Sequence, residues 1–147
     1  NTSPLGTAYL HTSVGDGPAN AELLERIGVV MRAVGNPYIL EGDWQMSPAE
    51  LIATGWPESI NGVVVSSGVC TYSSGEVSTE IDYFVVEKTL APFVVSCQTL
   101  RSNIISKHSP VRLTISGEAR SIQVYTIRLP PKIPPGIPLG CAGCPEN

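Results

Sequence analysis

The chain has 147 residues, a formal net charge of −4, and a composition in which 42% of the residues are hydrophobic. This length allows one domain with a modest core. The mild acidity argues against a nucleic-acid coat protein, which needs a basic stripe to neutralise phosphates. A nuclease stays open, because metal ions can supply positive charge inside an acidic site. No apolar run approaches the roughly 20 residues that cross a bilayer, so we expect no membrane span.

The N-terminus and the cysteines bear on the cellular compartment of the protein. The first residues, NTSPLGTAYLH, lack a starting Met, a basic region and a long apolar stretch. They therefore do not form a signal peptide, and we expect a fragment or a processed chain. Cys70 and Cys97 lie in apolar, strand-like segments, and the lone CxxC of Cys141 and Cys144 has no further ligand pair nearby. Reduced thiols are expected, which favours an intracellular compartment, with the nucleus as one candidate.

The first half of the chain predicts a strand, a helix and a second strand. The first strand covers 7–12. The helix opens at Pro18, which suits a first-turn position, and closes at Gly35. A short buried strand follows at 38–41. The apolar face of the helix should be formed by residues three and four apart: Leu23, Ile27, Val30, Met31 and Val34.

The second half predicts one short helix and a series of strands. Ser47 is expected to cap a helix over 48–54, with Glu50 at the capping-box position and Gly55 at its end. Together with the first half, this order predicts an α/β fold with one mixed sheet and flanking helices. The expected strands are 63–65, 69–72, 81–86, 93–98 and 111–116.

The end of the chain differs in composition from the rest. Residues 118–129 form an extension that could add one strand. From residue 130 the sequence reads PPKIPPGIPLGCAGCPEN. Proline at this density defeats both helix and sheet, so 130–147 is predicted to be a disordered Pro/Gly-rich tail.

Three segments place polar groups beside an apolar strand: ILEGDWQ with Asp43 and Gln45, STEIDYFVV with Asp82, and SKHSPVRL with His108. Alone, each has a plain interpretation as a turn, a solvent-facing carboxylate or a loop histidine. Strand ends, however, are where rigid scaffolds present reactive side chains. Alternation also sets Asp82 on the opposite face of its strand from its two apolar neighbours.

Together these residue types suit phosphodiester hydrolysis. That reaction needs an oriented and deprotonated water, donors on the phosphoryl oxygens, and usually a divalent metal to neutralise developing charge. A histidine paired with an aspartate can hold a proton at neutral pH and donate it to the phosphate.

The ordered motifs GDWQ (42–45), TEIDY (79–83) and SKHSP (106–110) resemble the endonuclease/exonuclease/phosphatase family, which includes deoxyribonuclease I. There they read Gly-Asp-x-Asn, Ser-x-Ile-Asp-Tyr and Ser-Asp-His-x-Pro. The resemblance implies that 1–117 is the C-terminal part of such a domain, about half of a four-layer α/β sandwich. It also implies hydrolysis of nucleic acid with Mg²⁺ or Mn²⁺.

The resemblance also implies roles for the motif residues. Asp43 would orient or deprotonate the attacking water and act as a weak metal ligand. Gln45 would contact the scissile phosphate. Asp82 would hydrogen-bond His108, and His108 would stabilise the charge of the phosphate.

Further substrate contacts are expected from neighbouring positions. The opening strand resembles a family strand that supplies an active-site Tyr or His, which makes Tyr9 a catalytic candidate and His11 a substrate-binding candidate. Trp44 and Lys107 lie inside the motifs themselves and are candidates for contacts with the substrate.

Departures from the family pattern leave alternatives open. Gln45 is longer than Asn, Lys107 stands where the family has Asp, and no counterpart of a metal-binding Glu precedes Thr7. We therefore expect the missing first half of the domain as a partner, and an apolar patch on the sheet over 63–65, 81–86 and 111–115. The oligomeric state is not predicted. The alternatives are a catalytically dead binding module and a phosphatase of inositol phosphates or phospholipids.

Overall fold

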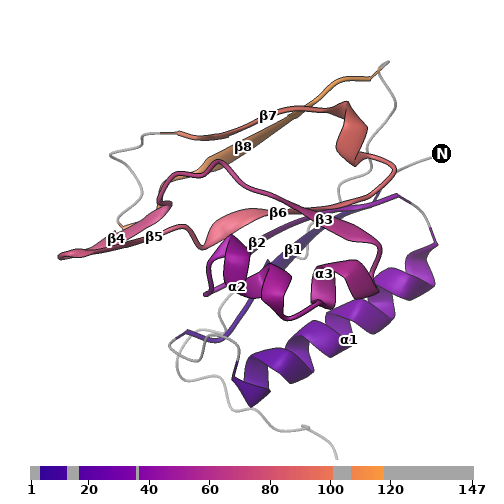
Figure 1. The fold of residues 1–147 in the computed structure, drawn as a ribbon, viewed down its shortest axis with the longest axis horizontal. Coiled ribbons are helices and arrows are strands. Elements are labelled where there is room, and N and C mark those ends of the chain that lie inside the picture. The colour runs from indigo at the N-terminus through magenta and orange to yellow at the C-terminus, as the bar shows by residue number, and fades with distance from the viewer. Residues whose placement is uncertain (1–3, 13–16, 36, 101–106, 118–147) are drawn as a thin grey trace, which may run out of the picture.

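A computed structural model describes residues 4–12, 17–35, 37–100 and 107–117 of the chain (Figure 1). The extension over 118–129, the tail over 130–147 and the CxxC cysteines lie outside the described residues. The elements in chain order are β1 (Leu5–Tyr9), α1 (Pro18–Val34), β2 (Ile39–Asp43), α2 (Pro48–Ala53), α3 (Trp56–Ser59), β3 (Gly62–Val65), β4 (Tyr72–Ser74), β5 (Val77–Thr79), β6 (Asp82–Glu87), the 3-10 turn η1 (Ala91–Phe93), β7 (Val94–Thr99) and β8 (Val111–Ile115).

The centre of the fold is a four-stranded mixed sheet in the order β1-β2-β6-β3. β1 and β2 are parallel and are joined by α1, whereas β6 is antiparallel to both of its neighbours, β2 and β3. Figure 1 shows the helices on one side of this sheet and the β7–β8 hairpin on the other. The predicted α/β class and mixed sheet with flanking helices are confirmed.

The helical layer and the sheet enclose an aromatic core. Trp44 is fully buried, with its ring 5.5 Å from that of Trp56 and 5.9 Å from that of Tyr83. Both indole N–H groups are satisfied: Trp44 donates to the Tyr83 carbonyl at 3.0 Å, and Trp56 to the Leu24 carbonyl at 2.6 Å. Buried indoles of this kind combine a large apolar area with a required hydrogen bond.

Helix α1 packs with part of its predicted face, since Leu23, Ile27 and Met31 lie partly buried against the core. Leu24 and Gly28 are its buried apolar positions, whereas Val30 is 59% exposed, so the predicted place of Val30 on the inner face is wrong. At Gly28 an added Cβ would lie 3.0 Å from Arg32 Nη1 and 3.2 Å from the Trp56 indole nitrogen. Without a side chain there, the helix approaches Trp56 closely. Within the described residues, no helix is long and apolar enough to cross a membrane.

The short helices follow the predicted caps, with one addition. The Glu50 amide donates to Ser47 Oγ at 3.3 Å and the Ser47 amide to Glu50 Oε2 at 2.7 Å, which is the predicted capping box. Gly55, at a φ of 72°, ends α2 as predicted. It also begins α3, which was not predicted because four residues are too few to show a helical period.

Two hairpins complete the described chain. The strand predicted at 69–72 is wrong in its bounds: β4 and β5 form a hairpin about Gly75, which has a φ of 63°. Strands of three residues show too little alternation to be recognised in the sequence. β7 and β8 form a second, antiparallel pair.

The apolar patch expected on the sheet is not found on the described strands. Phe84 and Val86 are buried, and alternation sets them on the face of β6 opposite Tyr83 and Val85, which pack in the core with the helices. The β7–β8 hairpin lies on that side of the sheet (Figure 1). The side over β1 and β2 is polar, with Thr7 donating to Glu41 at 2.9 Å. The expectation is therefore wrong for β6, whereas Val63–Val65 and the apolar residues of β8 are half-buried.

Candidate functional site

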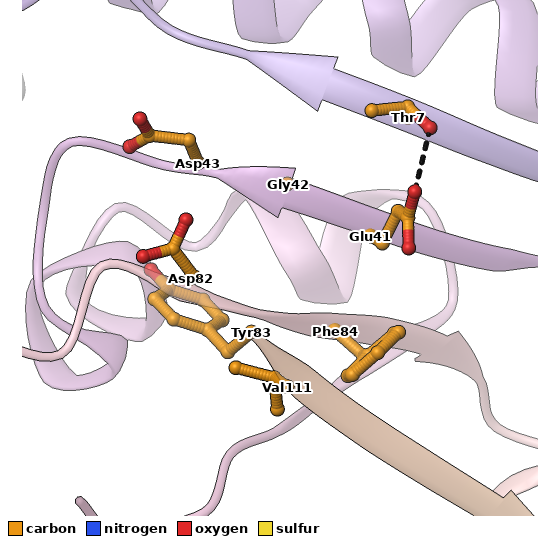
Figure 2. Close-up of a pocket in the computed structure, with 8 residues that line it drawn as sticks. All are labelled: Thr7, Glu41, Gly42, Asp43, Asp82, Tyr83, Phe84 and Val111. Atoms are coloured by element: carbon orange, nitrogen blue, oxygen red, sulfur yellow. Dashed lines mark hydrogen bonds between the residues drawn. The ribbon is translucent and has the colours of Figure 1, made fainter. Parts of the chain in front are cut away.

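The antiparallel pairing of β2 with β6 brings two carboxylates together. Asp43 is the last residue of β2 and Asp82 is the first residue of β6, and the two are direct partners in the ladder. Ile81 and Tyr83 are 8% and 1% exposed, which leaves Asp82 on the other face, as the alternation predicts. Figure 2 shows both carboxylates at the strand ends, beside a pocket of about 230 Å³ lined also by Thr7, Glu41, Gly42, Phe84 and Val111.

His108 completes the group from a third segment. Its Nδ1 lies 3.0 Å from Asp82 Oδ2 and 3.3 Å from Oδ1, so the structure places the predicted pair within hydrogen-bonding distance. The side chains of His108 and Asp82 are 34% and 24% exposed, so the pair stays open to ligands. Possible ligand atoms of Asp43, Asp82 and His108 all lie within 4.8 Å of one another. Three segments distant in sequence therefore converge at one edge of the sheet.

Gln45 turns back onto Asp43. Its Nε2 donates to Asp43 Oδ1 at 2.6 Å, and its backbone N–H donates to the same oxygen at 3.3 Å. The backbone of Gln45 has a φ of 53°, in the left-handed region that non-glycine residues seldom adopt. The amide predicted to contact a phosphate is thus engaged by the neighbouring carboxylate, and only a turn about its side-chain torsions would release it.

The electrostatics of the site are set by the two neighbouring carboxylates. Burial, and then the charge of Asp82, raise the pKa of Asp43 above its ordinary value, while the hydrogen bonds from Gln45 act in the opposite sense. A like charge close by disfavours the ionised form, and a bound cation would relieve that repulsion.

Changing Asp43 to Asn should raise the midpoint of thermal unfolding at pH 7 in the presence of EDTA. A raised pKa means that the folded state binds the proton more tightly than the unfolded state, so this carboxyl costs stability at pH values above its folded pKa. The cost vanishes below the ordinary pKa of aspartate, so the difference between variant and parent should close in acid. Thermal unfolding followed by circular dichroism from pH 3 to 8 measures this; an equal difference at every pH would contradict it.

The opening strand brings Tyr9, but not the side chain of His11, into register with the site. Tyr9 pairs with Asp43 in the parallel ladder, which puts both on the same face, and it is 64% exposed. His11 lies beyond the end of β1 and is exposed. Its backbone is fixed at both polar atoms by Asn20, whose Oδ1 accepts from the His11 N–H at 2.7 Å and whose Nδ2 donates to the His11 carbonyl at 3.1 Å.

The two remaining candidates differ in their exposure. Trp44 has no exposed surface, so the prediction that it contacts substrate is wrong: its ring fills the core between Trp56 and Tyr83. Lys107 is exposed, with a φ of 72°, and its carbonyl accepts from the Ser73 N–H at 2.9 Å. Lys107 is also the residue directly before His108 and carries a positive charge.

Two residues of the site were missed in the sequence. Tyr72 presents its ring edge-on to the His108 imidazole, with ring centroids 4.9 Å apart. Thr71 accepts the Asp82 N–H on its hydroxyl at 2.9 Å. Neither contact has a spacing that could be recognised in the sequence, because Tyr72 and His108 meet through an isolated antiparallel bridge between distant segments.

The donor set fits a hard divalent cation. Mg²⁺ and Mn²⁺ prefer carboxylate oxygens, and Mg²⁺ is usually held by one or two carboxylates, with waters and substrate phosphates as the other ligands. Asp43 and Asp82 supply such a pair, and the imidazole of His108 lies within the same 4.8 Å. His108 Nδ1 is already engaged by Asp82. The carboxylates are therefore the natural ligands.

Comparison of sequences finds no relative. No protein-family model matches the chain, and no curated protein sequence matches it.

Comparison of folds does find relatives. The endonuclease domain of TRAS1, a telomere-specific non-LTR retrotransposon, superposes with a TM-score of 0.62 at 14% identity over 76% of this chain and 56% of that domain. The 3′-5′ exonuclease NExo of Neisseria meningitidis gives 0.56 at 15% identity over 76% of this chain and 61% of that one. The cytolethal distending toxin of Actinobacillus actinomycetemcomitans gives 0.54 at 20% identity over 74% and 48%.

The chain thus spans about half to three-fifths of the length of these proteins. All three share the fold of this chain although few residues are identical. The described residues have the deoxyribonuclease I-like fold of the endonuclease/exonuclease/phosphatase enzymes.

Proposed function

We propose that this chain belongs to a phosphodiester hydrolase that uses a divalent cation, Mg²⁺ or Mn²⁺, and acts on nucleic acid. The observation that supports this most directly is the convergence of Asp43, Asp82 and His108 within 4.8 Å at one edge of the sheet. A cleft that brings together a paired histidine and two carboxylates from distant segments is the usual form of a catalytic site.

The side chains divide the work of hydrolysis. Asp43 orients the attacking water and accepts its proton, a role that its raised pKa favours because a stronger base is available nearer to neutral pH. Asp82 accepts from His108 Nδ1, and the imidazole in its doubly protonated form then presents its Nε2–H to a phosphate oxygen. Tyr9, exposed on the same face as Asp43, offers a hydroxyl to the substrate.

A divalent cation held by the carboxylates would neutralise the charge that develops on the phosphate. The remaining residues hold the substrate around it. Lys107, exposed beside His108, can pair with a neighbouring phosphate, and His11 at the end of β1 extends the same edge.

Nucleic acid is the proposed substrate because of the folds that this chain resembles. One structure of NExo that matches it, at a TM-score of 0.55 and 14% identity, holds a product DNA hairpin. A panel of metal-dependent assays on plasmid DNA, RNA and inositol phosphates tests the class of substrate. Cleavage of inositol phosphates alone would replace the nuclease proposal by a phosphatase.

The part of the relatives that this chain does not match is proposed to supply further ligands. The chain covers 56% of the TRAS1 endonuclease domain and itself offers only three candidate ligand groups in the described residues. We therefore expect the 147-residue chain alone to bind Mg²⁺ weakly and to cleave near background. A longer product of the same gene, if one is made, should cleave faster; restoring those residues should matter more than Gln45→Asn.

A second candidate function, a binding module without catalysis, is favoured by one observation. The Gln45 amide is bonded to Asp43 at 2.6 Å, which occupies an oxygen that a cation or water would need. Filter binding of DNA separates the two candidates from each other. Binding that neither needs a metal nor leads to cleavage in any form of the protein would establish the binding module.

The proposed location is intracellular, with the nucleus as one candidate. Cys70 and Cys97 are free thiols, which suits a reducing compartment.

Changing Lys107 to Asp should strengthen Mg²⁺ binding by about tenfold. An ammonium a few ångströms away repels the cation by on the order of 1 kcal/mol at near-surface dielectric, and a carboxylate replaces that repulsion with attraction. Asp also tolerates the left-handed backbone of this position, where φ is 72°. Calorimetric titration with Mg²⁺ measures the change.

The matched control is Lys107→Asn, which removes the positive charge and adds no carboxylate, in a residue that also tolerates this backbone. Its affinity should lie between those of the parent and of Lys107→Asp. Equal affinities in all three would mean that the charge at 107 does not reach the cation.

A further inference from the structure

Thr71 connects the segments that hold Asp82 and His108. Its side chain is almost fully buried, at 1% exposure, directly before β4. The Oγ1 atom accepts two backbone hydrogen bonds, from the Ile81 N–H at 3.0 Å and from the Asp82 N–H at 2.9 Å. One hydroxyl therefore fixes the backbone of the residue whose carboxylate holds the histidine.

The backbone of Thr71 reaches the other member of the pair. Its carbonyl accepts from the Ser109 N–H at 2.7 Å, one residue after His108. Its own N–H donates to the Thr79 carbonyl at 2.9 Å, which ties it to the hairpin. The next residue, Tyr72, forms the bridge with His108.

We infer that Thr71 is a positioning residue for the Asp82–His108 pair: its hydroxyl sets Asp82 and its carbonyl sets His108, so one residue fixes the distance between them. The effect on catalysis rests on the proposed function, whereas the effect on the pair's geometry does not. No other described contact joins both backbones through a single residue.

A hydroxyl is required at this position for a physical reason. The buried N–H groups of Ile81 and Asp82 must find an acceptor, and valine, which has the same shape as threonine, cannot provide one. Serine keeps the oxygen and loses only a methyl group. The pair Thr71→Val and Thr71→Ser therefore separates the hydrogen bonds from the packing.

The first test observes His108 directly. The chain has only two histidines, His11 and His108, so their ¹⁵N imidazole resonances can be assigned without ambiguity. In the parent, at a pH where the ring is neutral, an acceptor carboxylate on Nδ1 should hold His108 in the Nδ1–H tautomer. In Thr71→Val this preference should be lost, with the resonances moving toward those of a freely exchanging imidazole. Thr71→Ser should keep the tautomer of the parent, and His11 should not change in either variant.

Thr54→Val is the matched control. The Thr54 hydroxyl also accepts a backbone hydrogen bond, from the Trp56 N–H at 3.1 Å, but it lies at the end of α2. Its loss should leave His108 unchanged. A folded Thr71→Val protein with the His108 tautomer of the parent would overturn the inference, and so would an equal response to Thr54→Val.

A measurement on the parent covers the case in which Thr71→Val does not fold. The amide protons of Asp82 and Ser109 should exchange slowly with solvent, because both are hydrogen-bonded to Thr71. Rapid exchange at either amide overturns the inference.

The catalytic consequence is measured separately, in the form of the protein that cleaves. Thr71→Val should lower kcat by about tenfold to a hundredfold with little change in KM, since a misplacement of about an ångström has an effect of this order. Thr71→Ser should restore it. If no form of the protein cleaves, the proposed function fails while the ¹⁵N result still decides the role of Thr71. An unchanged kcat in a variant that has lost the tautomer would limit the inference to geometry and refute its catalytic part.

Discussion

Replacing His108 with Ala should reduce metal-dependent cleavage of nucleic acid by about two to four orders of magnitude, the usual contribution of a positioned acid or base. His108 is the imidazole that Asp82 holds at 3.0 Å, and its removal takes away both the proton donor and the group that aligns Asp82. Plasmid nicking under single-turnover conditions measures the ratio. The comparison is made in the form that cleaves above background, whether the 147-residue chain or a longer product of its gene.

The hydrogen bond between Asp82 and His108 allows a further test with a double variant. Asp82→Asn should lower the rate to a similar extent, and the double variant should be little worse than either single one, because residues that act as a unit are not additive. Lys88→Ala is the control: Lys88 forms a salt bridge with Glu58 just beyond the opposite end of β6. Losses that simply multiply in the double variant would show that Asp82 and His108 act independently.

Replacing Trp44 with Ala should destabilise the fold by about 3–5 kcal/mol, the usual cost of deleting a large buried aromatic side chain. Trp44 has no exposed surface and lies between the rings of Trp56 and Tyr83. The substitution removes those contacts and the indole hydrogen bond to the Tyr83 carbonyl. Urea unfolding followed by circular dichroism measures the loss, and in a domain of this size it can abolish folding.

Two further variants make the prediction specific. Trp44→Phe keeps an aromatic ring without the N–H and should cost less than Trp44→Ala. Val30→Ala changes a side chain that is 59% exposed on α1 and should cost less than about 0.5 kcal/mol. If Trp44→Ala kept its stability but lost affinity for nucleic acid, the burial described for this residue would be contradicted.

Local chemistry made part of this fold predictable. The capping box of Ser47 and Glu50, the ends of α1 at Pro18 and Gly35, and the orientation of Asp82 all depend on neighbouring residues, and each is found in the structure. Such features follow from hydrogen bonds or alternation within a few residues, so a single sequence is sufficient to infer them.

Features that depend on distant contacts were not predictable in the same way. The position of Trp44 inside the GDWQ motif predicts contact with substrate, yet the Trp56 and Tyr83 rings enclose it. The close approach of Gly28 to Trp56 is likewise a contact that no helical period reveals. The site itself was inferred from three separate motifs, and only pairing across the sheet could show that they meet.

The division between the middle and the ends of β6 has a consequence for how such a protein can change over evolutionary time. Val85 and Val86 in the middle of the strand have no exposed surface, so burial fixes the strand's register, and a slip of one residue would exchange its two faces. Asp82, at the end, is held in place by that register and contributes little to the core. Polar residues at the ends of the strand can therefore change while the scaffold persists. The fold and the chemistry at its edge are thus separable.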